Sequence, residues 1–181
     1  MRHALGLLAL CLAAACSSPE QFIASPKLVA QERIASRFAS IEVSEVSLPA
    51  YAARDEVTSS DAGVLVLSET LWADEPTRAM TLALSRHLAE ITGARVASDP
   101  WPFDGFPAAR VEVRVEDLIV DAGVLRMSGQ YFVVDLDGRG RDHAHLFDLS
   151  TPLPEGEAAA VAQARAQTVL DLALRIARDA L

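Results

Sequence analysis

The order in which hydrophobic periodicity changes along the chain is the strongest constraint on its fold. Apolar and polar residues alternate, as in half-buried strands, around residues 41–48, 56–60 and 64–67. A helical spacing follows, the alternation then returns, and a second helical pattern ends the chain. Strands, helix, strands, helix in one short chain predict a single α/β (α+β) domain. We expect a mixed, mostly antiparallel sheet with two main helices packed on one face.

Both expected helices have recognisable limits. The first opens at Asp74-Glu75-Pro76, where acidic residues and proline favour a first turn, and it stops at Gly93. Its apolar residues recur at helical spacing at Met80, Leu84, Leu88 and Ile91. The second helix is expected over residues 157–181 and has one apolar side. Each helix should therefore cover part of the sheet.

The second group of strands ends in three that are expected to form an antiparallel meander. A short strand over residues 94–97 comes first, and residues 111–115 then alternate valine with charged side chains. A long strand over residues 125–136 leads into the Asp137-Gly138 turn, and residues 143–149 return.

The first fifteen residues have the layout of a signal peptide, with a basic start, an apolar run over residues 4–12 and small residues before Cys16. We expect residues 1–15 to be removed, 16–30 to form a lipidated tether and 31–181 to form the domain. An ordinary secretory signal, cut after Ala15 without lipidation, is the alternative. The apolar run is shorter than the roughly 20 residues of a membrane-spanning helix.

Cysteine content agrees with a lipid anchor. The chain has two cysteines, Cys11 and Cys16, and the first would leave with the signal. The mature domain could then form no internal disulfide, and a thioether on Cys16 would remove its only thiol. Two or more acyl chains on one residue anchor a protein stably. We expect no cofactor other than this covalent lipid.

The net charge of the chain argues against two kinds of partner. The formal net charge is −9 at pH 7, and Lys27 is the sole lysine. Nucleic acid and direct electrostatic docking on anionic lipid are both disfavoured.

Candidate catalytic and metal-binding groups are sparse. His143 and His145 alternate on a strand and could hold a metal, but a solvated strand face explains them more simply, and no third ligand is identified. Asp135, Asp137 and Asp142 lack the full spacing of a calcium loop, so a tight hairpin is preferred. The sequence predicts no catalytic, cofactor-binding or metal-binding residue.

Aromatic residues make up 6% of the chain, so their clustering is informative. Trp101, Phe103 and Phe106 lie in a proline-punctuated loop, which predicts either a contact for a partner or a lid over the edge of the core. Trp72 is expected in the core. His87 is expected at the surface or rim of the first helix.

Several short motifs, in order and spacing, resemble the PqiC/YmbA-type auxiliary lipoproteins of ABC and MCE transport systems. The motifs are Leu48-Pro49-Ala50-Tyr51, Leu71-Trp72-Ala73 with Glu75-Pro76, Asp99-Pro100-Trp101-Pro102, residues 110–118 and residues 129–135. Only Phe22-Ile23 stands where the family has a Tyr-Tyr-x-Leu strand. The sequence therefore gives little support for an extra edge strand near the N-terminus.

The resemblance implies a non-enzymatic subunit at the periplasmic face of the outer membrane, with palmitate among its acyl chains. It would dock an MCE-domain conduit and assist lipid transport between the two membranes, which would support membrane integrity. The resemblance also implies that copies of the chain assemble into a homo-oligomeric ring. Two other classes stay open: a lipid-anchored metal-dependent hydrolase using His143 and His145, and another outer-membrane assembly lipoprotein.

Overall fold

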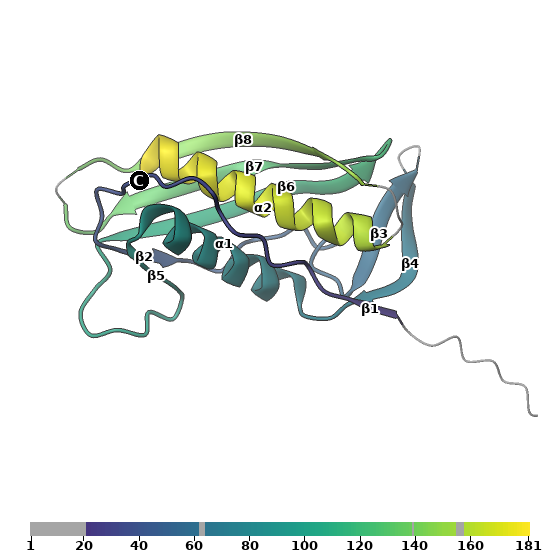
Figure 1. Ribbon diagram of the computed structural model, residues 1–181, viewed down its shortest axis with the longest axis horizontal. Coiled ribbons are helices and arrows are strands. Elements are labelled where there is room, and N and C mark those ends of the chain that lie inside the picture. Colours follow the sequence, from purple (N-terminus) through teal and green to yellow (C-terminus); the bar gives the residue numbers. More distant parts are fainter. Residues whose placement is uncertain (1–20, 62–63, 139, 155–157) are drawn as a thin grey trace, which may run out of the picture.

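The computed structural model describes residues 21–61, 64–138, 140–154 and 158–181. Figure 1 shows a long sheet with both helices on one face and a small sheet at one end. The predicted α/β domain with two helices on one face is confirmed. The elements are β1 (Gln21–Ile23), β2 (Ser40–Val43), β3 (Glu56–Asp61), β4 (Val64–Trp72), α1 (Pro76–Thr92), β5 (Arg95–Ser98), β6 (Ala109–Asp121), β7 (Val124–Asp135), β8 (His143–Pro152) and α2 (Ala158–Ala180).

The large sheet has five strands in the order β5-β2-β6-β7-β8. β2 is parallel to both of its neighbours, whereas β6, β7 and β8 pair antiparallel in succession. The expected meander is therefore confirmed. The inner face of the large sheet packs on buried residues of the helices, including Leu84 and Leu88 of α1 and Leu172 and Ile176 of α2.

The small sheet corrects one expectation. Its order is β1-β4-β3, and β1 pairs parallel with β4, with Phe22 opposite Leu71. An edge strand near the N-terminus thus exists, contrary to the expectation from the sequence. A strand of three residues is too short to show alternation, and its partner is distant in sequence. Residues 62 and 63, between the alternating ranges 56–60 and 64–67, lie outside the described residues.

Strand β2 is shorter than the alternation over residues 41–48 predicts. It ends at Val43, and only an isolated bridge at Ser47 continues the pairing with β6. The reason is a tertiary contact: the Val46 amide turns toward α1 and donates to Thr81 Oγ1 at 2.9 Å.

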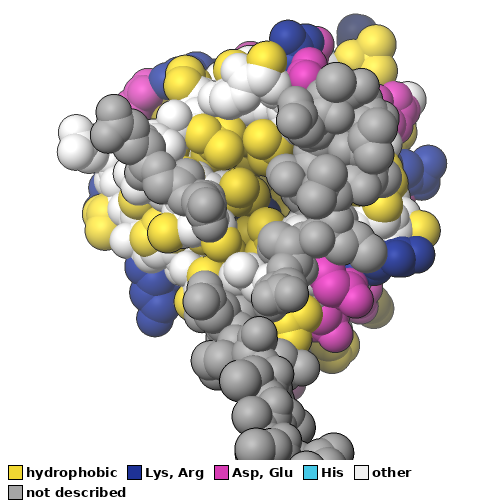
Figure 2. Space-filling view, turned by 90° about the vertical axis from the view of Figure 1, so that its right-hand side faces the viewer, with side chains coloured by type: hydrophobic (Ala, Val, Ile, Leu, Met, Phe, Trp, Pro, Cys, Tyr) yellow, Lys and Arg dark blue, Asp and Glu magenta, His cyan; other side chains and the backbone are white. Residues whose placement is uncertain are grey.

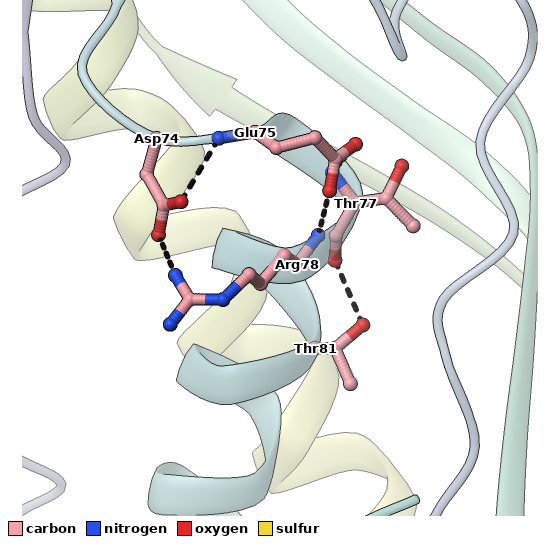
Figure 3. A network of polar contacts seen from close by, with 5 residues as sticks. All are labelled: Asp74, Glu75, Thr77, Arg78 and Thr81. Atoms are coloured by element: carbon pink, nitrogen blue, oxygen red, sulfur yellow. Dashed lines mark hydrogen bonds and ion pairs between the residues drawn. The ribbon is translucent and has the colours of Figure 1, made fainter.

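Helix α1 begins and ends where the sequence indicates. Glu75 is the N-cap, and its carboxylate accepts the amides of Thr77 at 2.9 Å and Arg78 at 2.6 Å (Figure 3). Burial acts to raise the pKa of Glu75, but these backbone hydrogen bonds outweigh it and leave the pKa below its ordinary value. Gly93 ends the helix in the left-handed conformation, with φ 69°.

Gly129 is required by a close approach between β6 and β7. A Cβ atom at this position would lie 2.1 Å from the carbonyl oxygen of Arg114, which is far inside van der Waals contact. The β6–β7 register shifts at the same place, between Val115 and Asp117. The glycine inside the predicted strand therefore accompanies a bulge.

Residues 24–39, which we call the N-terminal strap, run along the two helices on the side away from the sheet (Figure 1). The strap amides of Ala30 and Ile34 donate to Glu90 Oε2 at 3.4 Å and to the Ile91 carbonyl at 2.9 Å. Arg37 donates its amide to the Leu181 carbonyl at 2.7 Å. Residues 21–30, which the sequence assigns to the tether, thus lie against the domain.

Candidate functional site

The aromatic loop, residues 99–108, connects β5 to β6 and carries the aromatic cluster noted in the sequence. Trp101 and Phe103 pack edge to face, with ring centroids 4.9 Å apart. The Arg95 guanidinium lies 5.2 Å from the centroid of the Phe103 ring. Phe106 has no such ring or guanidinium contact with another described residue, and it is 96% exposed. The loop therefore combines a supported aromatic pair with one projecting ring.

An open cavity of about 540 Å³ lies beside this loop, between Phe106 and the strand residues Glu42 and Arg110. These two residues form an ion pair at 2.7 Å, and Glu42 is buried. Trp101 Nε1 is buried and has no hydrogen-bond partner. Trp101 is half-buried while Phe106 projects, so the loop has features of both expected alternatives, lid and contact.

The aromatic loop and the start of the described chain lie at opposite ends of the molecule. Figure 1 shows β1 at one end of the long axis and the β5–β6 loop at the other. Figure 2 views the β1 end, where hydrophobic side chains gather in a hollow. A small recess lies between β4, β6, β7 and α2 and is lined by Ala52, Trp72, Leu118, Leu125, Val161 and Arg165.

Arg165 of α2 is the functional candidate that the sequence did not reveal. Only 5% of the residue is exposed, and its guanidinium lies 3.5 Å from the centroid of the Trp72 ring. Its Nε and Nη2 donate to Ser25 Oγ at 3.2 Å and 2.9 Å. Burial lowers the pKa of Arg165 to about 10, so it keeps its charge at neutral pH. Trp72 is buried, which confirms its expected place in the core.

The helical spacing of α2 does hold a signal for Arg165. The arginine lies four residues from both Val161 and Val169, which places a charged residue on the buried side of the helix, but the spacing does not name its partners. Its partners Ser25 and Trp72 come from the strap and β4, and only the fold brings them together.

Comparison with protein families identifies the group to which this architecture belongs. The model of the ABC-type transport auxiliary lipoprotein component matches residues 23–177, nearly the whole described chain. The chain belongs to the ABC-type transport auxiliary lipoproteins. It is therefore a transport component of the cell envelope, as the sequence resemblance indicated.

Solved structures share the fold of this auxiliary lipoprotein. The crystal structure of an uncharacterized protein is 18% identical with a TM-score of 0.72, covering 88% of this chain and 97% of that one. Protein XCC0632 from Xanthomonas campestris is 15% identical with a TM-score of 0.69, covering 87% and 92%. The PelC dodecamer from Paraburkholderia phytofirmans, at 10% identity, covers 83% and 90%, but its TM-score of 0.43 is too low to show a shared fold. A search of curated proteins gives no significant match.

The two histidines expected as possible metal ligands do lie together on β8 of the auxiliary lipoprotein. Their rings stack at 5.8 Å between centroids, and His145 also stacks on Tyr131 at 5.2 Å. Within the described ranges, no group of three or more His, Cys, Asp or Glu side chains is arranged to hold a metal ion. The contacts of His143 and His145 are thus aromatic packing, and the hydrolase hypothesis gains no support from them.

The connection near these histidines turns at Gly138 as predicted, but it is longer than the tight hairpin expected, because β7 ends at Asp135 and β8 begins at His143. Asp142 Oδ1 accepts the Asp135 amide at 3.0 Å, and Gly138 adopts a φ of 67°. Arg139 lies outside the described residues.

The expectation for His87 is wrong. The residue is 1% exposed and lies close to residues 24–27 of the strap, with which it lines a cavity between α1 and α2. Its Nδ1 lies 3.6 Å from Glu90 Oε2 and makes no hydrogen bond. Burial lowers the pKa of His87, and the charge of Arg86 lowers it further.

Cys16 lies outside the described residues, so its lipidation stays a prediction. Among the helices in the described part of the chain, none has the length and apolar character to cross a membrane.

Proposed function

We propose that this auxiliary lipoprotein is a docking subunit of an intermembrane lipid transport system. In this proposal lipid on Cys16 fixes it at the periplasmic face of the outer membrane, and Trp101, Phe103 and Phe106 contact an MCE-domain conduit protein. One observation carries the proposal: the start of the described chain and the aromatic loop lie at opposite ends of the long axis (Figure 1). A domain built this way can bridge between an anchor and a partner.

The chemistry of the loop supports a protein contact. Aromatic side chains give large contact area at little entropic cost and are enriched among residues that dominate binding energy. Phe106 is 96% exposed, so its burial in a complex would remove nearly the whole ring from water. The nearby cavity offers a recess beside that ring.

A homo-oligomeric ring is part of the same proposal. Strand β8 is an edge of the large sheet, and its Leu146 is 69% exposed. Exposed edge strands pair readily with another copy. Light scattering of the intact lipoprotein in non-ionic detergent tests this part, since Leu146→Arg should reduce the measured mass if β8 forms the interface. An unchanged mass would exclude that interface.

A photo-crosslinking residue placed at position 106 tests the docking surface. In cell envelopes it should capture an MCE-domain protein, whereas the same residue at Val29, which is 72% exposed on the strap, should not. Equal capture from both positions, or capture of unrelated proteins only, would contradict the proposed surface.

The anchor needs a separate test. Cys16→Ser should abolish acylation and move the protein from the membrane fraction to the soluble periplasm. An unchanged membrane fraction would contradict the anchor while leaving the docking surface untouched.

A further inference from the structure

A cavity of about 340 Å³ lies between α1, α2 and residues 23–27, and we call it the α1–α2 cavity. Its walls are mainly apolar and include Ile23, Met80, Leu82 and Val169. Charged side chains also reach it, namely Lys27, Asp74, Arg86 and Arg165. Small-molecule pockets have volumes of roughly 300–1,000 Å³, so this cavity has room for a small or single-chain ligand.

Arg165 is a buried cation without an anionic partner. No carboxylate of a described residue lies within the 4.0 Å of an ion pair, and its polar contacts are both to the Ser25 hydroxyl. Burying an unpaired charge costs several kcal/mol, so such residues are rare unless a partner or a function compensates. The cation–π contact with the Trp72 ring offsets only part of this cost.

The two carboxylates whose charges act on Arg165, those of Asp74 and Glu75, are already engaged. Asp74 Oδ1 accepts the Glu75 amide at 3.0 Å, and Oδ2 accepts Arg78 Nη1 at 2.5 Å (Figure 3). Both carboxylate oxygens of Glu75 accept backbone amides at the start of α1. The four oxygens thus have partners, which leaves the Arg165 guanidinium available to an incoming anion.

The surroundings of the cavity are locally cationic in an acidic protein. Lys27 has no acidic partner among the described residues, and Arg86 meets Glu90 only at 4.0 Å. Asp74 is the one acidic residue in the lining, and it is paired with Arg78. Three cations therefore face the cavity, although the formal net charge of the chain is −9. This complementarity favours a negatively charged ligand.

We propose that the α1–α2 cavity binds a single-chain anionic amphiphile, with its carboxylate or phosphate on Arg165 and its hydrocarbon chain along Ile23, Met80 and Val169. The guanidinium supplies paired donors for such a head group, and the apolar wall excludes water from the chain. This ligand-binding role goes beyond docking and does not depend on it.

Native mass spectrometry of the whole lipoprotein, released from non-ionic detergent, provides the test. The probes are laurate, lauroyl lysophosphatidate, dodecanol and inorganic phosphate. We expect one laurate or one lysophosphatidate per chain, with dodecanol and phosphate each at least about tenfold weaker, because one lacks the charge and the other the chain. Equal retention of dodecanol would overturn the role of Arg165, and equal retention of phosphate would overturn that of the apolar wall.

Arg165→Met removes the charge and keeps an unbranched side chain over Trp72. We expect at least about tenfold weaker binding of laurate, and a Tm at or above that of the wild type, because loss of an unpaired buried charge is often stabilising. Arg126→Met, at an exposed arginine of β7, is the matched control and should bind as the wild type does. Wild-type affinity in Arg165→Met would sink the proposal.

A second variant keeps the test decisive if Arg165→Met does not fold. Ala83 of α1 lines the cavity and is only half-buried, so Ala83→Leu should narrow the space without touching the guanidinium. It should weaken laurate binding and leave any weak retention of phosphate unchanged. A folded Ala83→Leu protein with wild-type affinity for laurate would contradict the proposed path of the chain.

Discussion

The aromatic loop and the α1–α2 cavity present opposite arrangements of functional groups. The loop gathers Trp101, Phe103 and Phe106 within a short stretch of sequence, and Phe106 projects fully into solvent. The cavity gathers Ser25, Arg86 and Arg165 from three distant segments and buries the guanidinium. A contact surface can thus be a local feature, whereas a binding cavity in this fold requires the strap and both helices. Changes at Trp72, Glu75, His87 and Phe106 test this difference.

The largest effect is expected for Trp72→Ala, at the buried aromatic beneath Arg165. The change removes a core side chain and the ring on which the guanidinium stacks, and should lower the free energy of unfolding by about 3–5 kcal/mol. Denaturant unfolding measures it. A loss below about 1 kcal/mol would mean that the core at this point is much less tightly packed than the contacts indicate.

Glu75→Ala should have a smaller effect of about 1 kcal/mol, because two amides at the start of α1 lose their acceptor. Glu45→Ala, at an exposed glutamate outside any helix, is the control and should leave stability unchanged. If Glu75→Ala were as stable as Glu45→Ala, the N-cap would make no measurable contribution to the stability of α1, which forms one wall of the cavity.

His87 makes the stability of the cavity region depend on pH. Burial and the charge of Arg86 lower its pKa below the ordinary 6.5, so the unfolded chain binds a proton more readily than the fold does. The free energy of unfolding is therefore highest above pH 6.5 and decreases as the pH falls from 6.5 toward the folded pKa. Denaturant titrations across this range should show the decrease in the wild type.

His87→Leu removes that proton-binding difference and should flatten this part of the pH dependence. An unchanged slope in His87→Leu would mean that another group causes the pH dependence.

The smallest stability effect is expected for Phe106→Ala. Its ring is 96% exposed, so the free energy of unfolding should change by no more than about 0.5 kcal/mol. Docking to the partner, measured by co-purification from envelopes, should nevertheless decrease. A markedly unstable Phe106→Ala variant would mean that this side chain stabilises the fold, and the contrast between the loop and the cavity would then no longer hold.

Local signals in the sequence determined much of this protein. Glu75-Pro76 and Gly93 set the limits of α1, the valine alternation over residues 111–115 set the inner face of β6, and the aromatic loop was evident from its composition. The family resemblance rested on similar short motifs and is confirmed over residues 23–177. These features are local because caps, strand alternation and turns depend on neighbouring residues.

Tertiary contacts, and no local pattern, account for the burial of His87, the early end of β2 and the pairing of β1 with β4. Each depends on a partner distant in sequence: the strap over α1, Thr81 for the Val46 amide, and Leu71 opposite Phe22. Arg165 is the clearest case. A helical pattern can assign it a position on α2, but whether its charge meets water, a carboxylate or a cavity depends on which segments pack around it, and hydrophobic periodicity carries no information about those segments.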